Sequence, residues 1–106
     1  MKESKFQARL IRELKDRLPG CVVLKNDPNY IQGFPDLTVL YGPRWACLEV
    51  KRNSKASHQP NQDFYVRYLD KMGFSRFISP ENKEEVLNDL ERSLEPHRKA
   101  RSAQSE

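Results

Sequence analysis

The chain has 106 residues, 32% of them charged and 37% hydrophobic, which is typical of one soluble globular domain with a single modest core. Nineteen Lys and Arg against fifteen Asp and Glu leave a net charge of +4, which permits a polyanionic partner without requiring one. Cys21 and Cys47 lie in apolar segments without metal-binding spacing, so we expect buried thiols in a reducing compartment. No apolar run is long enough to span a membrane, and the polar N-terminus is unlike a signal peptide, so we expect a cytoplasmic protein.

The first part of the chain predicts a helix, a strand and a loop. Residues 4–18 place apolar side chains at helical spacing, with Ser4 and Gln7 as a capping box and a Pro-Gly pair as the stop. Residues 21–26 predict a short apolar strand. The polar loop that follows, residues 27–33, contains a proline and a glycine that exclude regular structure.

Two central strands are predicted over residues 36–41 and 45–52, joined by a Gly-Pro turn. A polar connection leads to a second helix over residues 61–72, with Pro60 in its first turn and Gly73 as its stop. The inward stripe of this helix is expected to consist of Phe64, Tyr65, Tyr68, Leu69 and Met72.

The last part of the chain predicts a strand over residues 74–79 and a helix that opens at Ser79-Pro80-Glu81. Residues 96–106 are polar, and we expect them to be a disordered tail whose basic side chains are solvated. The sequence therefore predicts a single α/β domain over residues 1–95. A central mixed sheet flanked by helices is expected, in the order α-β-β-β-α-β-α.

Charged side chains gather at one end of the two central strands. Because side chains alternate across a strand, Glu49 and Lys51 share one face. If the two strands pair as a hairpin, Asp36 at the start of the first comes close to both. Two carboxylates and an ammonium at one end of an apolar sheet are unfavourable unless they have a use, so this cluster is a candidate functional site.

The chemistry that fits this cluster is metal-dependent phosphodiester hydrolysis. Asp36 and Glu49 supply the oxygen ligands that Mg²⁺ or Mn²⁺ prefers, and the backbone carbonyl of Val50 offers a third. Lys51 is placed to orient or deprotonate an attacking water and to stabilise charge on the phosphate. The alternative is a set of surface ion pairs at a sheet edge, which contribute little to stability.

Pro35-Asp36 followed by Glu49-Val50-Lys51 resembles the PD-(D/E)xK nuclease motif. The resemblance extends over residues 3–94 and looks like the compact VRR-Nuc (virus-type replication-repair nuclease) domains, including small stand-alone phage proteins related to Holliday-junction resolvases. The matching residues are Glu3 with Gln7, Lys25-Asn26, Gly33-Phe-Pro-Asp-Leu, Leu48-Glu-Val-Lys-Arg and Pro60-Asn-Gln62. This resemblance implies a restriction-endonuclease-like core.

Carried over by position, the resemblance implies that Asp36 and Glu49 are metal ligands and Lys51 the catalytic lysine. Gln62 is similar to a helix glutamine that supports the metal-bound water or the lysine, although an ordinary polar residue of a first helical turn has the same appearance. Glu3 resembles an N-terminal glutamate that reaches a metal-bound water or a second metal, and it decides between one metal and two. Glu13 competes for this role on the same helix.

Residues around the cluster suggest how nucleic acid is held. Four basic residues are expected to contact phosphates near the site: Lys25, Arg44, Arg52 and Lys55. Tyr30 and Phe34, in the loop over the site, are expected either to stack on unpaired bases or to pack within the protein. Gly33 lets backbone segments approach closely, and Pro35 holds an extended entry to Asp36.

The sequence contains no helix-turn-helix, zinc finger or basic helix, so we expect recognition of DNA shape rather than of base sequence. The resemblance implies a structure-specific DNA endonuclease that cuts branched DNA, such as Holliday junctions or flaps, in phage or mobile-element replication, recombination or repair. It also implies a homodimer. If the chain is phage-encoded, the protein is expected in the host cytoplasm. A replication or recombination protein is a possible further partner. The alternatives are a non-catalytic nucleic-acid-binding accessory domain of the same fold and a structural interaction module.

Overall fold

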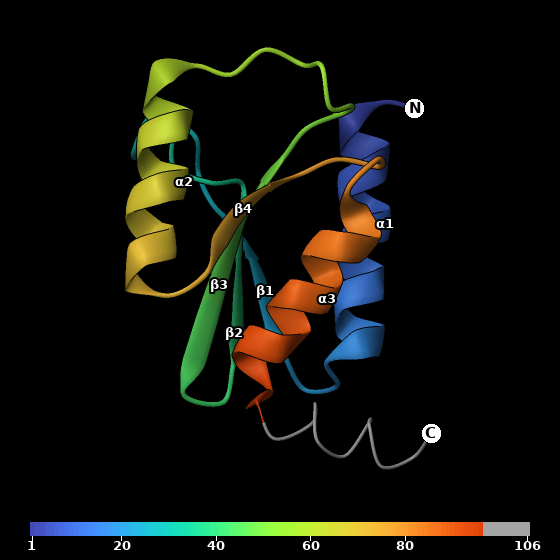
Figure 1. Ribbon diagram of the computed structural model, residues 1–106. Coiled ribbons are helices and arrows are strands. Elements are labelled where there is room, and N and C mark those ends of the chain that lie inside the picture. Colours follow the sequence, from blue (N-terminus) through green and yellow to red (C-terminus); the bar gives the residue numbers. More distant parts are fainter. Residues whose placement is uncertain (97–106) are drawn as a thin grey trace.

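The structure is a computed structural model that describes residues 1–96, and these form a mixed four-stranded sheet and three helices (Figure 1). The elements in chain order are α1 (Glu3–Arg17), β1 (Val22–Lys25), β2 (Leu37–Tyr41), β3 (Arg44–Val50), α2 (Pro60–Met72), β4 (Ser75–Ile78) and α3 (Lys83–Leu94). The predicted α/β class and the order α-β-β-β-α-β-α are confirmed. The predicted tail lies, apart from Pro96, outside the described residues.

The four strands stand in the order β1-β2-β3-β4, with the first three antiparallel and β4 parallel to β3. Gly42, at a positive φ of 58°, makes the tight turn between β2 and β3. A parallel pair needs a crossover connection, and α2 supplies it between β3 and β4. The register pairs Leu37 with Leu48, so residue 36 lies beside residue 49.

The main core lies between one face of the sheet and the helices α1 and α3, which lie together on that side (Figure 1). The helices contribute Phe6, Leu10, Leu14, Leu18, Val86, Leu87, Leu90 and Leu94. Alternate strand residues contribute Leu37, Val39, Ala46, Leu48, Val50 and Ile78. Each fully buried large side chain contributes about 1.5–3 kcal/mol of burial free energy, so the apolar stripes of these two helices hold the sheet in place.

Helix α2 lies alone on the opposite face and packs mainly against β3 and β4 (Figure 1). Only Val66 and Leu69 of this helix are buried. The predicted inward stripe is therefore wrong in part, because the side chains of Phe64, Tyr68 and Met72 are 58%, 53% and 61% exposed. The same face of β1 and β2 is also partly open, since Val22, Leu24 and Leu40 are 50%, 44% and 40% exposed.

Two helix starts differ from the sequence prediction. Helix α1 begins at Glu3, and Lys2 at its N-cap makes no side-chain cap, so the capping box predicted at Ser4 is wrong. Helix α3 begins at Lys83 rather than at residues 79–81. There, the side-chain oxygen of Asn82 accepts a 2.8 Å hydrogen bond from the backbone N–H of Ser79, and this local turn competes with helix.

No helix within residues 1–96 combines the length and the apolar composition needed to cross a membrane. Both cysteines are free thiols: Cys47 is buried, and Cys21 is partly exposed.

Candidate active site

Asp36 lies directly before β2, beside the end of β3, and its neighbours hold it on both sides. The backbone N–H of Val50 donates a 2.8 Å hydrogen bond to Asp36 Oδ2. The backbone N–H of Asn26, after the end of β1, donates a 2.8 Å hydrogen bond to the carbonyl oxygen of Asp36. The hairpin thus brings Asp36 to the end of β3, as its register predicts. The role of the Val50 carbonyl as a metal ligand stays a prediction.

The side chain of Asn26 fixes the same corner of the sheet. Its Nδ2 donates to the carbonyl oxygen of Pro35 at 2.9 Å and to Thr38 Oγ1 at 2.8 Å. Asn26 therefore spans the entry into β2 and limits the movement of Asp36. From the sequence, Asn26 was identified only as part of the family resemblance. Its contacts were not predicted, because they join residues on either side of the loop.

Glu49 is the most deeply buried carboxylate of the cluster, with 3% of its surface exposed. Burial, followed by the nearby Asp36 carboxylate, raises the pKa of Glu49 from 4.5 to about 8, and the Lys51 ammonium opposes this increase. The charge of Glu3 raises the pKa further. Two close carboxylates in a buried setting favour either a proton or a cation between them.

Lys51 is buried too, with 8% of its surface exposed, and it lies on the same face as Glu49. Its Nζ donates to Gln62 Oε1 at 2.8 Å and to the carbonyl oxygen of Ser57 at 3.0 Å, and it lies 3.9 Å from Glu49 Oε2. An ammonium has three N–H groups, and these two hydrogen bonds use two of them. The third N–H is available to a substrate or a water at the carboxylates.

Gln62 joins the two charged groups. Its Nε2 donates a 3.1 Å hydrogen bond to Glu49 Oε2, while its Oε1 accepts from Lys51 and, at 2.9 Å, from the backbone N–H of Gln59. This residue is the third of α2, so the first turn of the helix carries a side chain that spans the sheet end. Gln62 is thus in contact with the cluster, and the supporting role that the resemblance implies for it stays a prediction.

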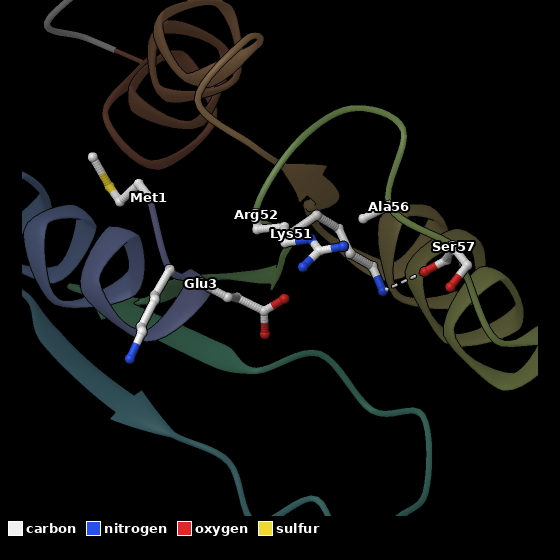
Figure 2. Close-up of a pocket in the computed structure, with 7 residues that line it drawn as sticks. Met1, Glu3, Lys51, Arg52, Ala56 and Ser57 are labelled. Carbon is white, nitrogen blue, oxygen red and sulfur yellow. Dashed lines mark hydrogen bonds between the residues drawn. The ribbon is translucent and has the colours of Figure 1, made fainter.

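A cavity of about 710 Å³ opens beside Lys51 (Figure 2). It is lined by Met1, Lys2, Glu3, Lys51, Arg52, Ala56 and Ser57. Figure 2 shows the Glu3 carboxylate extending from the first turn of α1 toward Lys51 and Arg52. Glu13 is bound elsewhere, to Arg17 and Lys83 between α1 and α3. The structure brings Glu3, and not Glu13, to the cluster.

Only some of the predicted phosphate-binding residues lie at this end of the sheet. Arg52 lines the cavity, Lys25 ends β1 next to the start of β2, and Lys55 is exposed in the connection before α2. Arg44 begins β3 and is therefore about 17 Å along the strand from Glu49. Arg44 lies too far away to share a phosphate with this cluster.

The two aromatic residues of the loop have different surroundings. Phe34 packs against Tyr65, with ring centroids 5.7 Å apart, so packing rather than base stacking describes it. Tyr30 is 83% exposed. The predicted close approach at Gly33 is confirmed: its φ is +87°, and an added Cβ would lie 2.3 Å from Asn61 Cβ.

A feature that the sequence did not reveal is the short segment that positions Lys51. Ser57 supplies a carbonyl oxygen to the lysine, and the next residue, His58, stacks on Phe77 with centroids 3.9 Å apart and an angle of 12° between the rings. His58 Nδ1 also lies 3.0 Å from Asp63 Oδ1. One sequence signal pointed to this segment: Gln59 and Gln62 have the spacing of a capping pair, which predicts the start of a helix directly after His58.

The donor set suits a hard divalent cation. Among the described residues, no group of three or more His, Cys, Asp or Glu is arranged to hold a metal. Mg²⁺, however, is usually bound through only one or two carboxylates, together with waters and substrate phosphate. Asp36 and Glu49 meet that requirement, and a cation between them would offset both the burial and the neighbouring Asp36 charge that raise the pKa of Glu49.

Comparison of this chain with models of known protein families, with curated proteins and with solved structures found no match to any of them.

Proposed function

We propose that this protein is a divalent-metal-dependent, structure-specific DNA endonuclease that hydrolyses phosphodiester bonds in branched DNA. The observation that carries the proposal is the convergence of Asp36, Glu49, Lys51 and Gln62 at one end of the sheet, with Glu49 and Lys51 both buried. Buried charged groups are unfavourable, and surface ion pairs would not need such burial. The same proposal includes membership of the VRR-Nuc domains, which the sequence resembles. Through that resemblance it also includes a role in phage or mobile-element replication, recombination or repair.

The chain's own residues divide the work. Asp36 is held in place by Val50 and Asn26, and it would share a cation with Glu49. When bound, Mg²⁺ or Mn²⁺ supplies a Lewis acid that activates water and neutralises charge on the phosphate. Lys51, fixed by Ser57 and Gln62, directs its remaining N–H toward the attacking water or a phosphate oxygen.

The cavity beside Lys51 suits the phosphate backbone of the substrate. Lys2, Lys51 and Arg52 line it, and cations at this position attract a polyanion whatever its base sequence. Nothing within residues 1–96 forms a helix-turn-helix or a similar base-reading element. These features favour selection of DNA by shape.

We also propose that the protein acts as a homodimer, because a symmetric cut in a four-way junction needs two active sites. The open face beside α2 is the surface that fits, since it exposes Phe64, Tyr68, Met72, Val22, Leu24 and Leu40. Exposed apolar side chains gathered on one face are typical of interaction surfaces.

Sedimentation should show a dimer that Tyr68→Glu converts to a monomer, while Arg12→Glu, on the exposed side of α1, leaves the dimer unchanged. A wild-type monomer would contradict this assignment.

The test of the nuclease is cleavage of labelled four-way junction, flap, single-stranded and linear duplex DNA with Mg²⁺, Mn²⁺, Ca²⁺ or chelator. We expect metal-dependent cutting of a branched form, and its loss in Lys51→Ala and Asp36→Asn. Thermal unfolding of each variant separates lost chemistry from lost fold. If wild type and Lys51→Ala bind DNA alike and neither cuts any form, the accessory-domain alternative replaces the proposal.

A further inference from the structure

A second hollow, of about 420 Å³, lies beside Gln62 and shares no lining residue with the cationic cavity beside Lys51. It is lined by Pro28, Gln32, Gly33, Gln59, Pro60, Asn61 and Gln62, so the loop before β2 forms one wall and the first turn of α2 the other. Gln62 lines this hollow, and its side chain binds Lys51 and Glu49 of the candidate active site. The hollow therefore adjoins the candidate active site.

The lining of this hollow differs in chemistry from the cationic cavity. It contains no charged side chain, whereas Lys2, Lys51 and Arg52 line the other. Proline rings supply apolar surface, and side-chain amides supply hydrogen-bond donors and acceptors. A phosphate would find no cation here. A neutral ligand with apolar faces and a polar edge fits, and a nucleobase has both properties.

Two of the amides are free to bind such a ligand. Within residues 1–96, the side chains of Gln32 and Asn61 make no hydrogen bond to the rest of that stretch. Side-chain amides pair with base edges through one donor and one acceptor. By contrast, Gln62 already uses both ends of its amide on Lys51 and Glu49. Gln32 and Asn61 are thus the residues available for recognition.

The shape of the hollow is set before any ligand arrives. Gly33, at a φ of +87°, lies so close to Asn61 that an added Cβ would be 2.3 Å from Asn61 Cβ. This contact holds the loop against α2. Tyr30, in the same loop, is 83% exposed and offers a ring on which a base can stack.

We propose that the hollow between the loop and α2 binds one unpaired nucleobase of the substrate, next to the phosphate that is cut. The inference rests on the proposed nuclease function and deepens it, because it assigns the backbone to the cationic cavity and a base to the neutral hollow. A base in a duplex must first be unstacked and unpaired at a cost in free energy, so an unpaired nucleotide enters more readily. Preference for a branch or single-strand junction follows from this requirement.

The first test measures binding and does not depend on turnover. Flap DNA is titrated with the protein in Ca²⁺, with an abasic nucleotide placed in turn at each unpaired position near the branch. We expect one position at which loss of the base weakens wild-type binding about fivefold to tenfold, as expected when contacts to one base are lost. The Gln32→Ala/Asn61→Ala variant should bind intact flap DNA as weakly as the wild type binds the abasic flap. Removing the base should not weaken binding to this variant any further.

Both substitutions are chosen to leave the fold and the catalytic cluster intact. Asn61→Ala keeps the Cβ that contacts Gly33 and removes only the amide. The matched control is Asn29→Ala, which lies in the same loop but does not line the hollow, and it should keep the full abasic effect. An unchanged abasic effect in the double variant overturns the proposal. So does a wild type that is insensitive to an abasic site at every position.

Cleavage in Mg²⁺ separates this inference from the proposed function. Base-dependent binding without any metal-dependent cutting supports the hollow and removes the nuclease. Metal-dependent cutting without base dependence supports the nuclease and removes the hollow. If both are present, the double variant should raise KM for flap DNA and change kcat little, because the amides contact a base and not the reacting phosphate.

Discussion

Glu49 and Lys51 face the same side of β3, with Lys51 Nζ 3.9 Å from Glu49 Oε2, and both side chains are almost fully withdrawn from solvent. A direct hydrogen bond would be shorter, so the pair is held close without being joined. The amide of Gln62 fills the space between them, as it accepts from the lysine and donates to the glutamate. Lys51 therefore keeps one N–H that neither Gln62 nor Ser57 uses, and Glu49 lies beside Asp36, with which it could share a cation.

Replacing Gln62 should impair chemistry more than binding. Gln62→Ala removes both contacts, so Lys51 and Glu49 move toward each other and close the gap. We expect kcat to fall about tenfold to a hundredfold, with KM changed little. The lost hydrogen bonds should lower the free energy of unfolding by about 1–3 kcal/mol.

The measurement for Gln62 is steady-state cleavage together with urea unfolding. The control is Asn88→Ala, which removes one hydrogen bond to Arg17 on the far side of the domain. This control should leave kcat unchanged. A Gln62→Ala variant with wild-type kcat would show that the glutamine is an ordinary helix residue.

Glu49 should make the metal-free protein less stable as the pH rises. Its pKa is about 8 in the folded protein and 4.5 in its unperturbed form, so the folded state binds the proton more tightly. The folded state therefore loses stability between these two pH values, by an amount on the order of a few kcal/mol. Urea unfolding in chelator across this range measures the slope.

The variant Glu49→Gln isolates this contribution. It lacks the titrating carboxylate, so its free energy of unfolding should fall less over the same range and exceed that of wild type near pH 8. Adding Mg²⁺ should restore stability to wild type at the higher pH and leave Glu49→Gln unaffected, because ligands that bind the folded state stabilise it. Equal slopes in wild type and variant would contradict the raised pKa.

His58 should act through the position of Lys51. His58→Ala removes the stacking on Phe77 and the contact with Asp63, and it frees the neighbouring carbonyl of Ser57. We expect a loss of about 1 kcal/mol of stability and a fall of several-fold in kcat.

The matched variant is His58→Phe, which keeps a ring on Phe77 and loses only the contact with Asp63. It should retain most of the activity if stacking is what positions the segment. Cleavage rates of both variants decide the point. Equal impairment by the two would show that the hydrogen bond to Asp63 matters more than the stacking.

Gly33→Ala should be far more damaging than the same change at Gly42. Both glycines have a positive φ, which disfavours alanine at either position. An added Cβ at Gly33 would meet Asn61 at 2.3 Å, while at Gly42 nothing lies within 4 Å. We expect about 1–2 kcal/mol of lost stability at Gly42 and at least twice that at Gly33.

Thermal and urea unfolding of the two variants measure this difference. The backbone strain is shared, so the excess at Gly33 reports the contact between the loop and α2. Similar losses at the two positions would mean that the loop is not held against the helix.

Much of this protein follows from its sequence alone. Apolar periodicity predicts α1 and the strands, because a single stripe facing the sheet repeats along each element. The tight turn at Gly42 and the alternation along β3 were enough to predict that Asp36, Glu49 and Lys51 lie at one end of the hairpin. Local rules of this kind depend only on neighbours along the chain.

Contacts between distant segments were decided by the tertiary structure. The sequence suggests that Tyr68 and Met72 face inward, but α2 packs mainly against β3 and β4, and these two side chains remain exposed. The stacking of His58 on Phe77 carries no sequence signature, since it joins the connection before α2 to β4. The hydrogen bond from Lys51 to the carbonyl of Ser57 depends on how that connection folds back on itself. The apolar period of a helix shows which side chains share one face. How much of that face is buried depends on the packing of the whole domain.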